Sequence, residues 1–315
     1  MPRLLLHALG PVLAFASVIA VADAAPSIKV TLLGTGCPPP VMNRFGPSTL
    51  VEVGSRKFVF DAGRGALQRL TQVGIRWRSV DGLFLTHLHS DHVVGFPDLW
   101  LTGWLIAPGR SAPLSVWGPA GTGAMMSNLE KAFEYDVHIR IENDGASAEG
   151  VKLVSHDIGE EVAYDDSGVK ISAFTVDHGA ARPALGYRID FAGHSVVLSG
   201  DTRFSENLIR HAQGVDLLVH EVFVPETLER AGVPPRQAKN IVAYHLTPEE
   251  AGEVFARTKP KQAVFSHVCL PSARDDEVLL RARKTYSGPL EVGEDLMVID
   301  VAEQVSVRRA IGLAP

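Results

Sequence analysis

Cysteine and blocks of positive charge are both scarce in this chain. Only two of its 315 residues are cysteine, which does not fit a closed, cysteine-rich structural zinc site. The net charge is −6, and no cluster of lysine and arginine stands out along the chain. Electrostatic capture of nucleic acid therefore has little support in the composition, and we expect no nucleic acid partner.

Long apolar runs and low-complexity linkers are missing after the first two dozen residues. We therefore expect one domain over residues 25–315, with no membrane span in the mature protein. The N-terminus is different, because Arg3 precedes an apolar run over residues 4–20 and Ala22-Asp23-Ala24 has the form of a cleavage site. This pattern predicts a signal peptide over residues 1–24 and a periplasmic or secreted protein. An uncleaved membrane anchor is the alternative.

Short runs rich in β-branched residues, ended by Gly or Pro, predict strands along the rest of the chain. They cover residues 28–33, 48–53, 57–60, 82–85, 114–117, 169–176, 185–191, 195–198, 216–220, 262–265 and 296–301. Helical spacing predicts helices over residues 65–73 and 96–106, and a capping box at Thr247 starts a third. Residues 142–150 and 160–168 are polar and predict solvent loops. Strands interleaved with helices imply an α/β fold of two face-to-face sheets with helices outside.

The segment Thr86–His92 carries four metal-binding side chain types within six residues, at His-x-His-x-Asp-His spacing. They are His87, His89, Asp91 and His92. On a loop, this spacing directs two imidazoles toward one metal, and a carboxylate and a third imidazole toward a second. Imidazole and carboxylate suit Zn²⁺, with Mn²⁺ and Fe²⁺ as alternatives. A polar loop with surface histidines is the other interpretation.

Three further residues of ligand type, His178, Asp201 and His267, each follow an expected strand. One such residue alone is more often a turn, a cap or a hydrogen-bonded core group. Together with the histidine loop they complete two sites: His87, His89 and His178 for one metal, Asp91, His92 and His267 for the other, and Asp201 as the bridge. Each metal then keeps an open position for water, as in catalytic sites. Two such cations activate a water between them.

His245 lies just before the third helix and is not needed to complete the metal count. At the rim of a pocket it would donate a proton to a leaving oxygen or stabilise developing negative charge. Glu221 ends an expected strand and is the candidate to orient it. A structural role is the alternative for both residues.

Two open questions concern the surroundings of this site. Cys37 and Cys269 would form one disulfide in an oxidising compartment, and two free thiols are the alternative. Phe96, Trp100 and Trp104 follow the histidine loop and would either line an apolar pocket or pack as core.

In chain order, these residues resemble the metallo-β-lactamase superfamily, and more narrowly its ribonuclease Z-like branch, which includes periplasmic arylsulfatases. The matching motifs are Leu33-Gly34-Thr35-Gly36, Phe60-Asp61-Ala62-Gly63, Thr86–His92, Trp117-Gly118-Pro119, Gly186-Tyr187-Arg188-Ile189, Ser199-Gly200-Asp201-Thr202, His220-Glu221 and Phe265-Ser266-His267. The resemblance implies an αββα four-layer sandwich with a two-zinc site. It also implies that His245 is a proton donor partnered by Glu221, and that Asp61 is a buried supporting carboxylate.

The chain departs from that branch in one interval. Ribonuclease Z enzymes that process transfer RNA carry a long protruding arm between the equivalents of His178 and Asp201, where this chain has only 22 residues. With the export signal, this argues against transfer RNA maturation. We therefore expect an exported hydrolase of small anionic esters, aryl sulfates or phosphodiesters, in which Asp91 holds or deprotonates the water and His245 assists the leaving group.

Two other functions stay open on the same residues. Lactone or β-lactam hydrolysis uses similar metal chemistry on a carbonyl, and a non-catalytic metal-binding protein would keep the fold alone. The expected partner is a small-molecule ester, and a homodimer is left open.

Overall fold

The structure is a computed structural model that describes residues 27–106, 108–268 and 274–310. The signal peptide expected over residues 1–24 lies outside these ranges, and so does Cys269. In the described ranges, no helix combines the length and the apolar character needed to cross a membrane.

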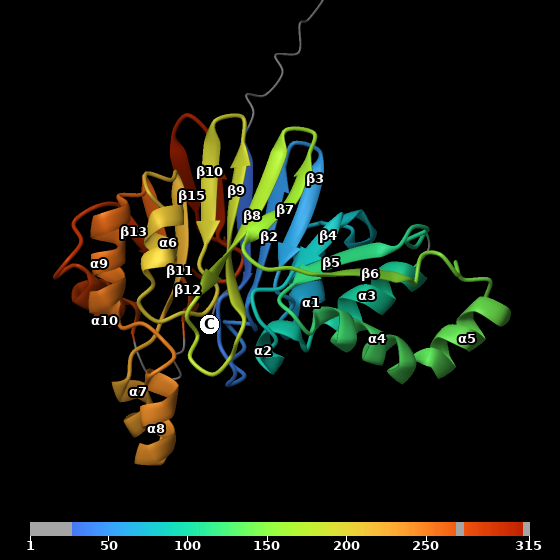
Figure 1. The fold of residues 1–315 in the computed structure, drawn as a ribbon, viewed down its shortest axis with the longest axis horizontal. Coiled ribbons are helices and arrows are strands. Elements are labelled where there is room, and N and C mark those ends of the chain that lie inside the picture. The colour runs from blue at the N-terminus through green and yellow to red at the C-terminus, as the bar shows by residue number, and fades with distance from the viewer. Residues whose placement is uncertain (1–26, 107, 269–273, 311–315) are drawn as a thin grey trace, which may run out of the picture.

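Two mixed sheets face each other in the centre of the molecule (Figure 1). The first sheet has the order β15 (Val305–Arg308), β14 (Val298–Val301), β1 (Ile28–Gly34), β2 (Ser48–Val53), β3 (Arg56–Phe60), β4 (Gly82–Phe84), β5 (Leu114–Gly118) and β6 (Leu153–Asp157). The second has the order β13 (Leu290–Val292), β12 (Gln262–Val268), β11 (Leu217–Val222), β10 (His194–Leu198), β9 (Ala184–Phe191), β8 (Val169–Val176) and β7 (Glu161–Asp166).

Helices cover the outer face of each sheet (Figure 1). The first sheet carries α1 (Ala66–Gln72), α2 (Ser90–Val93), α3 (Phe96–Leu105), α4 (Thr122–Ala132) and α5 (Glu134–Glu142) on its side of the molecule. The second carries α6 (Glu206–His211), α9 (Pro248–Thr258) and α10 (Asp275–Ala282). Two short helices, α7 (Glu226–Arg230) and α8 (Pro235–Val242), project from the lower end of the sandwich.

Three large apolar clusters fill the spaces between these layers. Phe84 and Tyr187 are fully buried in the cluster that residues of both sheets form. Trp100 and Leu99 lie between the first sheet and its helices, and Phe255 lies between the second sheet and α9. Each sheet is therefore apolar on both faces, which confirms the four-layer αββα sandwich.

Strand direction determines where the polar site residues meet. In the first sheet β3, β4, β5 and β6 are parallel. In the second, β10, β11 and β12 are parallel, and β8 runs the same way because the antiparallel β9 lies between β8 and β10. The carboxyl ends of parallel strands lie at one edge of a sheet, where ligands commonly bind. Residues that follow these strands are therefore brought together.

The structure tests several of the local predictions made from the sequence. The capping box is present, because the Thr247 hydroxyl accepts from the Glu250 N–H and Glu250 accepts from the Thr247 N–H. The expected solvent loop over residues 160–168 is wrong, since β7 forms there. Its side chains are largely exposed because it is the edge strand of its sheet, so no apolar alternation marked it. Phe96, Trp100 and Trp104 are buried core residues.

Candidate metal centre

The histidine loop is held at the edge of the first sheet by Asp61, which directly follows β3. One carboxylate oxygen of Asp61 accepts from the Thr86 N–H at 2.8 Å, and the other accepts from the Thr86 hydroxyl at 2.8 Å. The second oxygen also lies 2.8 Å from Nδ1 of His92. With Nδ1 held from behind, the Nε2 atom of His92 faces the site, which is the usual arrangement of a metal-binding histidine and its supporting carboxylate.

The second sheet supplies one residue from each of three strands. His178 follows β8, Asp201 follows β10, and His267 lies within β12 near its end. The Nδ1 atom of His178 lies 3.0 Å from the Tyr244 carbonyl, which orients its ring. Gly200 allows the two edges to approach, because a Cβ on it would lie 2.9 Å from Cβ of Thr86.

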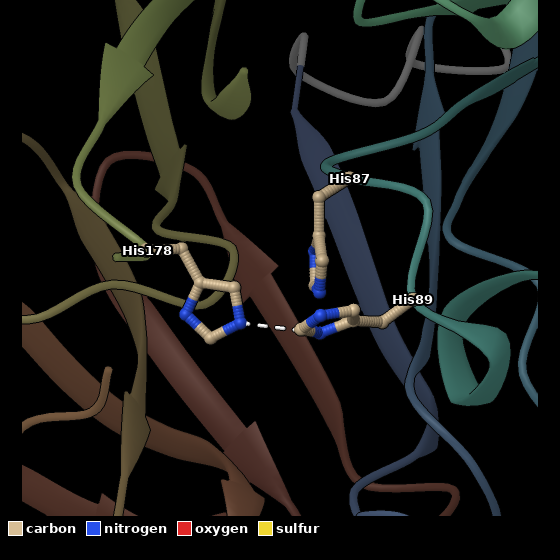
Figure 2. A group of neighbouring side chains, drawn as sticks. All are labelled: His87, His89 and His178. Carbon is tan, nitrogen blue, oxygen red and sulfur yellow. Dashed lines mark hydrogen bonds between the residues drawn. The ribbon is translucent and has the colours of Figure 1, made fainter. Parts of the chain in front are cut away.

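The two sets of residues meet in two adjoining clusters, each with ligand atoms within 4.8 Å of one another. Figure 2 shows the first cluster, in which His178 points across the gap toward two imidazoles of the loop. Its members are His87, His89 and His178, and those of the second are Asp91, His92 and His267.

Asp201 lies between the clusters. Its Oδ2 atom is 3.9 Å from Nε2 of His87 and of His178, 3.4 Å from Nε2 of His92 and 3.3 Å from Nε2 of His267. The structure therefore brings all seven predicted ligand residues together, with Asp201 near histidines of both clusters.

The donor set fits cations rather than a purely hydrogen-bonded core. Nε2 of His87, Nε2 of His92 and Oδ1 of Asp201 are buried without a hydrogen-bond partner among the described residues. Buried polar atoms are rarely left unpaired, and these three belong to the facing clusters. Because the donors are imidazole and carboxylate with no thiolate among them, the His/Asp clusters are consistent with a binuclear metal site.

The electrostatics prepare several of these ligands for a metal. Burial lowers the pKa of His87 well below its usual range and lowers that of His178 to about 4. Both rings are therefore neutral at physiological pH, which is the form that binds metal. Burial also lowers the pKa of His92, but the charges of Asp201 and Asp61 outweigh it and raise the pKa well above its usual range. A cation at this position would replace that proton.

His245 and Glu221 form a hydrogen-bonded pair beside the clusters. Nδ1 of His245 lies 2.9 Å and 3.1 Å from the two carboxylate oxygens of Glu221, and one of these oxygens also accepts from the Thr202 N–H at 2.8 Å. Burial lowers the pKa of His245, but the charge and hydrogen bond of Glu221 outweigh it and raise the pKa to about 9. The His245 ring therefore carries a proton at neutral pH. Its Nε2 side lies toward the site, since His178, Asp201 and His245 form a further group of neighbouring ligand atoms.

Besides a small cavity of ≈ 50 Å³ beside His92, Asp201 and His267, two larger cavities open onto the clusters. The larger, of ≈ 480 Å³, extends from His89, His178 and His245 to the inner faces of α7 and α8. The smaller, of ≈ 240 Å³, is lined by His87, His89 and Arg182, the last being its only lysine or arginine among the described lining residues.

Sequence reasoning missed the walls of these cavities. Neither Arg182 nor the apolar residues of α7 and α8 form a recognisable motif, so no pattern marked them. Cys37, at the rim of the larger cavity, is disulfide-bonded, while Cys269 lies outside the described residues.

Comparisons with known proteins identify relatives over nearly the whole chain. The β-lactamase superfamily domain matches residues 56–268. Ribonuclease Z of Mycobacterium sp. (strain KMS) is 36% identical over 285 residues, which are 90% of this chain and 99% of that protein. Among solved structures, the metallo-β-lactamase fold protein YhfI of Bacillus subtilis has a TM-score of 0.70 at 17% identity and covers 87% of this chain and 99% of its own. Human tRNase Z, short form, has a TM-score of 0.65 at 21% identity, with the same coverage.

These relatives correct the expectation of a small-molecule partner and no nucleic acid. The mycobacterial relative is named Ribonuclease Z, and the match takes in 90% of this chain and 99% of that protein. Similarity to a ribonuclease over nearly the whole chain overturns the expectation that was drawn from the short interval between His178 and Asp201. The net charge of −6 was therefore not a sufficient reason to exclude a nucleic acid partner.

Proposed function

We propose that this chain, a metal-dependent hydrolase of the metallo-β-lactamase superfamily, acts on phosphodiesters, including those of RNA. It belongs to that superfamily, and its homologues are ribonuclease Z-like. The observation that carries the proposal is the His245–Glu221 pair beside the two clusters, 2.9 Å apart at its closest atoms. A protonated imidazole in this place serves a reaction in which an oxygen must leave as an alcohol.

Two zinc ions would be held by the seven predicted ligands, of which Asp201 lies between the two clusters. Bound there, the ions would polarise a phosphoryl oxygen and lower the pKa of a water. In this proposal Asp91, whose Oδ2 lies 3.4 Å from Nε2 of His267, would take the proton of the attacking water.

Proton transfer at the other end of the reacting bond falls to His245. As the bond between phosphorus and the leaving oxygen breaks, Nε2 of His245 gives its proton to that oxygen. Glu221 holds Nδ1 and stabilises the charged ring. Arg182, in the smaller cavity beside His87 and His89, adds a positive charge for an anionic substrate.

The test is turnover by purified, zinc-loaded protein of bis(4-nitrophenyl) phosphate and of an RNA with a 3′ extension. We expect His245→Ala to lower kcat by roughly 10²–10⁴-fold with two metals per chain retained. Glu221→Gln, which keeps the shape of the partner, should give a smaller loss. Absence of phosphodiester turnover with both metals bound would contradict the proposal, and loss of metal from His245→Ala would make His245 a ligand instead.

Aryl sulfate hydrolysis is the second candidate, because the larger cavity is mainly apolar and reaches the same clusters. 4-Nitrophenyl sulfate in the same assay decides between them. Turnover of the sulfate with none of the phosphodiesters would replace the first candidate by the second.

Export is a separate proposal that rests on residues 1–24 alone. Cell fractionation and N-terminal sequencing would test it. A mature start at Ala25 outside the cytoplasm is expected, and an uncleaved chain in the membrane fraction would support an anchor. A full-length cytoplasmic protein would contradict export.

A further inference from the structure

The larger cavity is a compartment with two different ends. One end is made by the metal clusters and His245. The other is made by α7 and α8, the two short helices at the lower end of the sandwich (Figure 1). Its volume of ≈ 480 Å³ is within the range of cavities that bind small organic groups.

The wall away from the metal clusters is apolar. Its residues are Cys37, Pro38, Pro39, Phe223, Thr227, Leu228, Ala231, Val233, Gln237, Ile241 and Tyr244. None of these described residues is acidic or basic, and Gln237 and Thr227 are the polar ones apart from the Tyr244 hydroxyl. The charged side chains of this region, such as Arg236 and Lys239, are exposed and do not line the cavity. Such a wall favours an uncharged group and disfavours a second phosphate.

Aromatic rings lie at the junction of the two ends. Phe223 stacks on His245, with ring centroids 5.2 Å apart and planes at 25°. Tyr244 lies edge-on to His178 at 6.0 Å. A planar ring attached to the leaving oxygen would lie between these aromatic side chains and the apolar residues Leu228 and Ile241. This surrounding favours an aromatic occupant over a flexible alkyl chain.

We propose that this cavity binds an uncharged aromatic ring carried by the leaving alcohol. The proposal rests on the proposed function, because His245 sets the direction. The oxygen that receives its proton must lie next to Nε2, and the cavity that His245 lines is the apolar one. The other ester arm then lies toward the smaller cavity, where Arg182 is available for its charge. The ring belongs either to an aryl ester or to the base of the leaving nucleoside, and the two sources share this chemistry.

The experiment uses zinc-loaded protein and two phosphodiesters that differ only in the leaving phenol, 4-nitrophenol or 4-nitro-1-naphthol. We expect the two-ring ester to have a KM roughly tenfold lower, because the added ring buries more apolar surface. The free naphthol should likewise inhibit competitively at a roughly tenfold lower concentration than the free nitrophenol. A dinucleotide, compared with the same dinucleotide lacking the base of its leaving nucleoside, tests the nucleobase source.

Variants of the wall connect these effects to the cavity. Leu228→Asn and Ile241→Asn should each remove most of the preference for the second ring, and Gln237→Leu should increase it. Leu280→Asn is the matched control, because Leu280 is an apolar residue on α10 that is 72% exposed. Thermal unfolding checks that each variant is folded.

The outcomes separate the two proposals. If no phosphodiester is hydrolysed, the proposed function fails, and the inference that rests on it is overturned with it. If hydrolysis occurs but ring size, base removal and wall substitutions leave KM and inhibition unchanged, the cavity does not hold the leaving group and the inference is overturned. A preference confined to the aryl esters, or to the dinucleotide, supports the inference and identifies the source of the ring.

Discussion

The two sheets supply the metal centre in different ways. The first contributes four residues from one short segment, His87 to His92, held by a single carboxylate, Asp61. The second contributes His178, Asp201 and His267 from the ends of three separate strands. The geometry of the first set is local, whereas that of the second depends on β8–β12 being assembled in the right order. The first half therefore depends on the pairing of two neighbouring strands, β3 and β4, and the second on a whole sheet.

The residue that joins the halves should have the largest effect. Asp201→Ala removes the carboxylate that lies within 3.9 Å of Nε2 of four histidines from both sheets. We expect at least one metal to be lost and kcat/KM to fall on the order of 10³-fold, since metal stabilisation of the transition state is worth several kcal/mol. Metal analysis and phosphodiester kinetics measure this.

Asp190→Ala is the control for Asp201→Ala, because Asp190 is also an acidic residue of the second sheet but pairs with Arg188 away from the clusters. It should keep both metals. Two metals retained by Asp201→Ala would show that the halves do not depend on a shared carboxylate.

The support of the first half gives the next largest effect. Asp61 has a left-handed backbone with φ 58°, which asparagine also tolerates, so Asp61→Asn changes the carboxylate with little backbone strain. An amide cannot accept from Thr86 and His92 as the carboxylate does. We expect metal affinity to fall roughly 10–100-fold, measured by competition with a chromogenic chelator.

A matched carboxylate of the first sheet gives the comparison for Asp61→Asn. Asp157, at the end of β6, accepts from the N–H groups of Gly121 and Gly123 and does not contact the clusters. Asp157→Asn should leave metal affinity unchanged. Equal losses in the two variants would mean that Asp61 acts through general stability of the sheet edge.

The same contrast explains how much the sequence predicts. The histidine loop is recognisable because its four ligand types lie within six residues, and the strands of the second sheet because they are continuous apolar runs. Glu221 was named as the partner of His245 from its place at a strand end, and Asp61 as a supporting carboxylate only through the family resemblance. The Tyr244 carbonyl beside His178 was not predicted. Edge strand β7 and helix α5, which has no buried residue, were missed, since weakly buried elements show little apolar periodicity. The α7–α8 wall was missed as well, because both helices are short. The expectation of no nucleic acid partner was wrong, and the comparison with Ribonuclease Z corrects it.

The smallest predicted effect tests whether the second sheet is sensitive to acid apart from its metal ligands. His220 in β11 is buried against Phe255, with ring centroids 5.9 Å apart, and its Nδ1 lies 2.8 Å from the Glu221 carbonyl. Burial lowers the pKa of His220 to about 4, against about 6.5 in the unfolded chain. Between these values the unfolded state binds a proton that the folded state does not. The free energy of unfolding is therefore complete above pH 6.5 and decreases as the pH falls toward 4, by about 2 kcal/mol from pH 7 to pH 5. In urea unfolding of the metal-free proteins, the loss of unfolding free energy from pH 7 to pH 5 should be smaller by that amount in His220→Phe than in wild type. His156→Phe on the first sheet is the control for replacing histidine by phenylalanine. Equal losses in wild type and His220→Phe would show that acid acts on other groups of the second sheet.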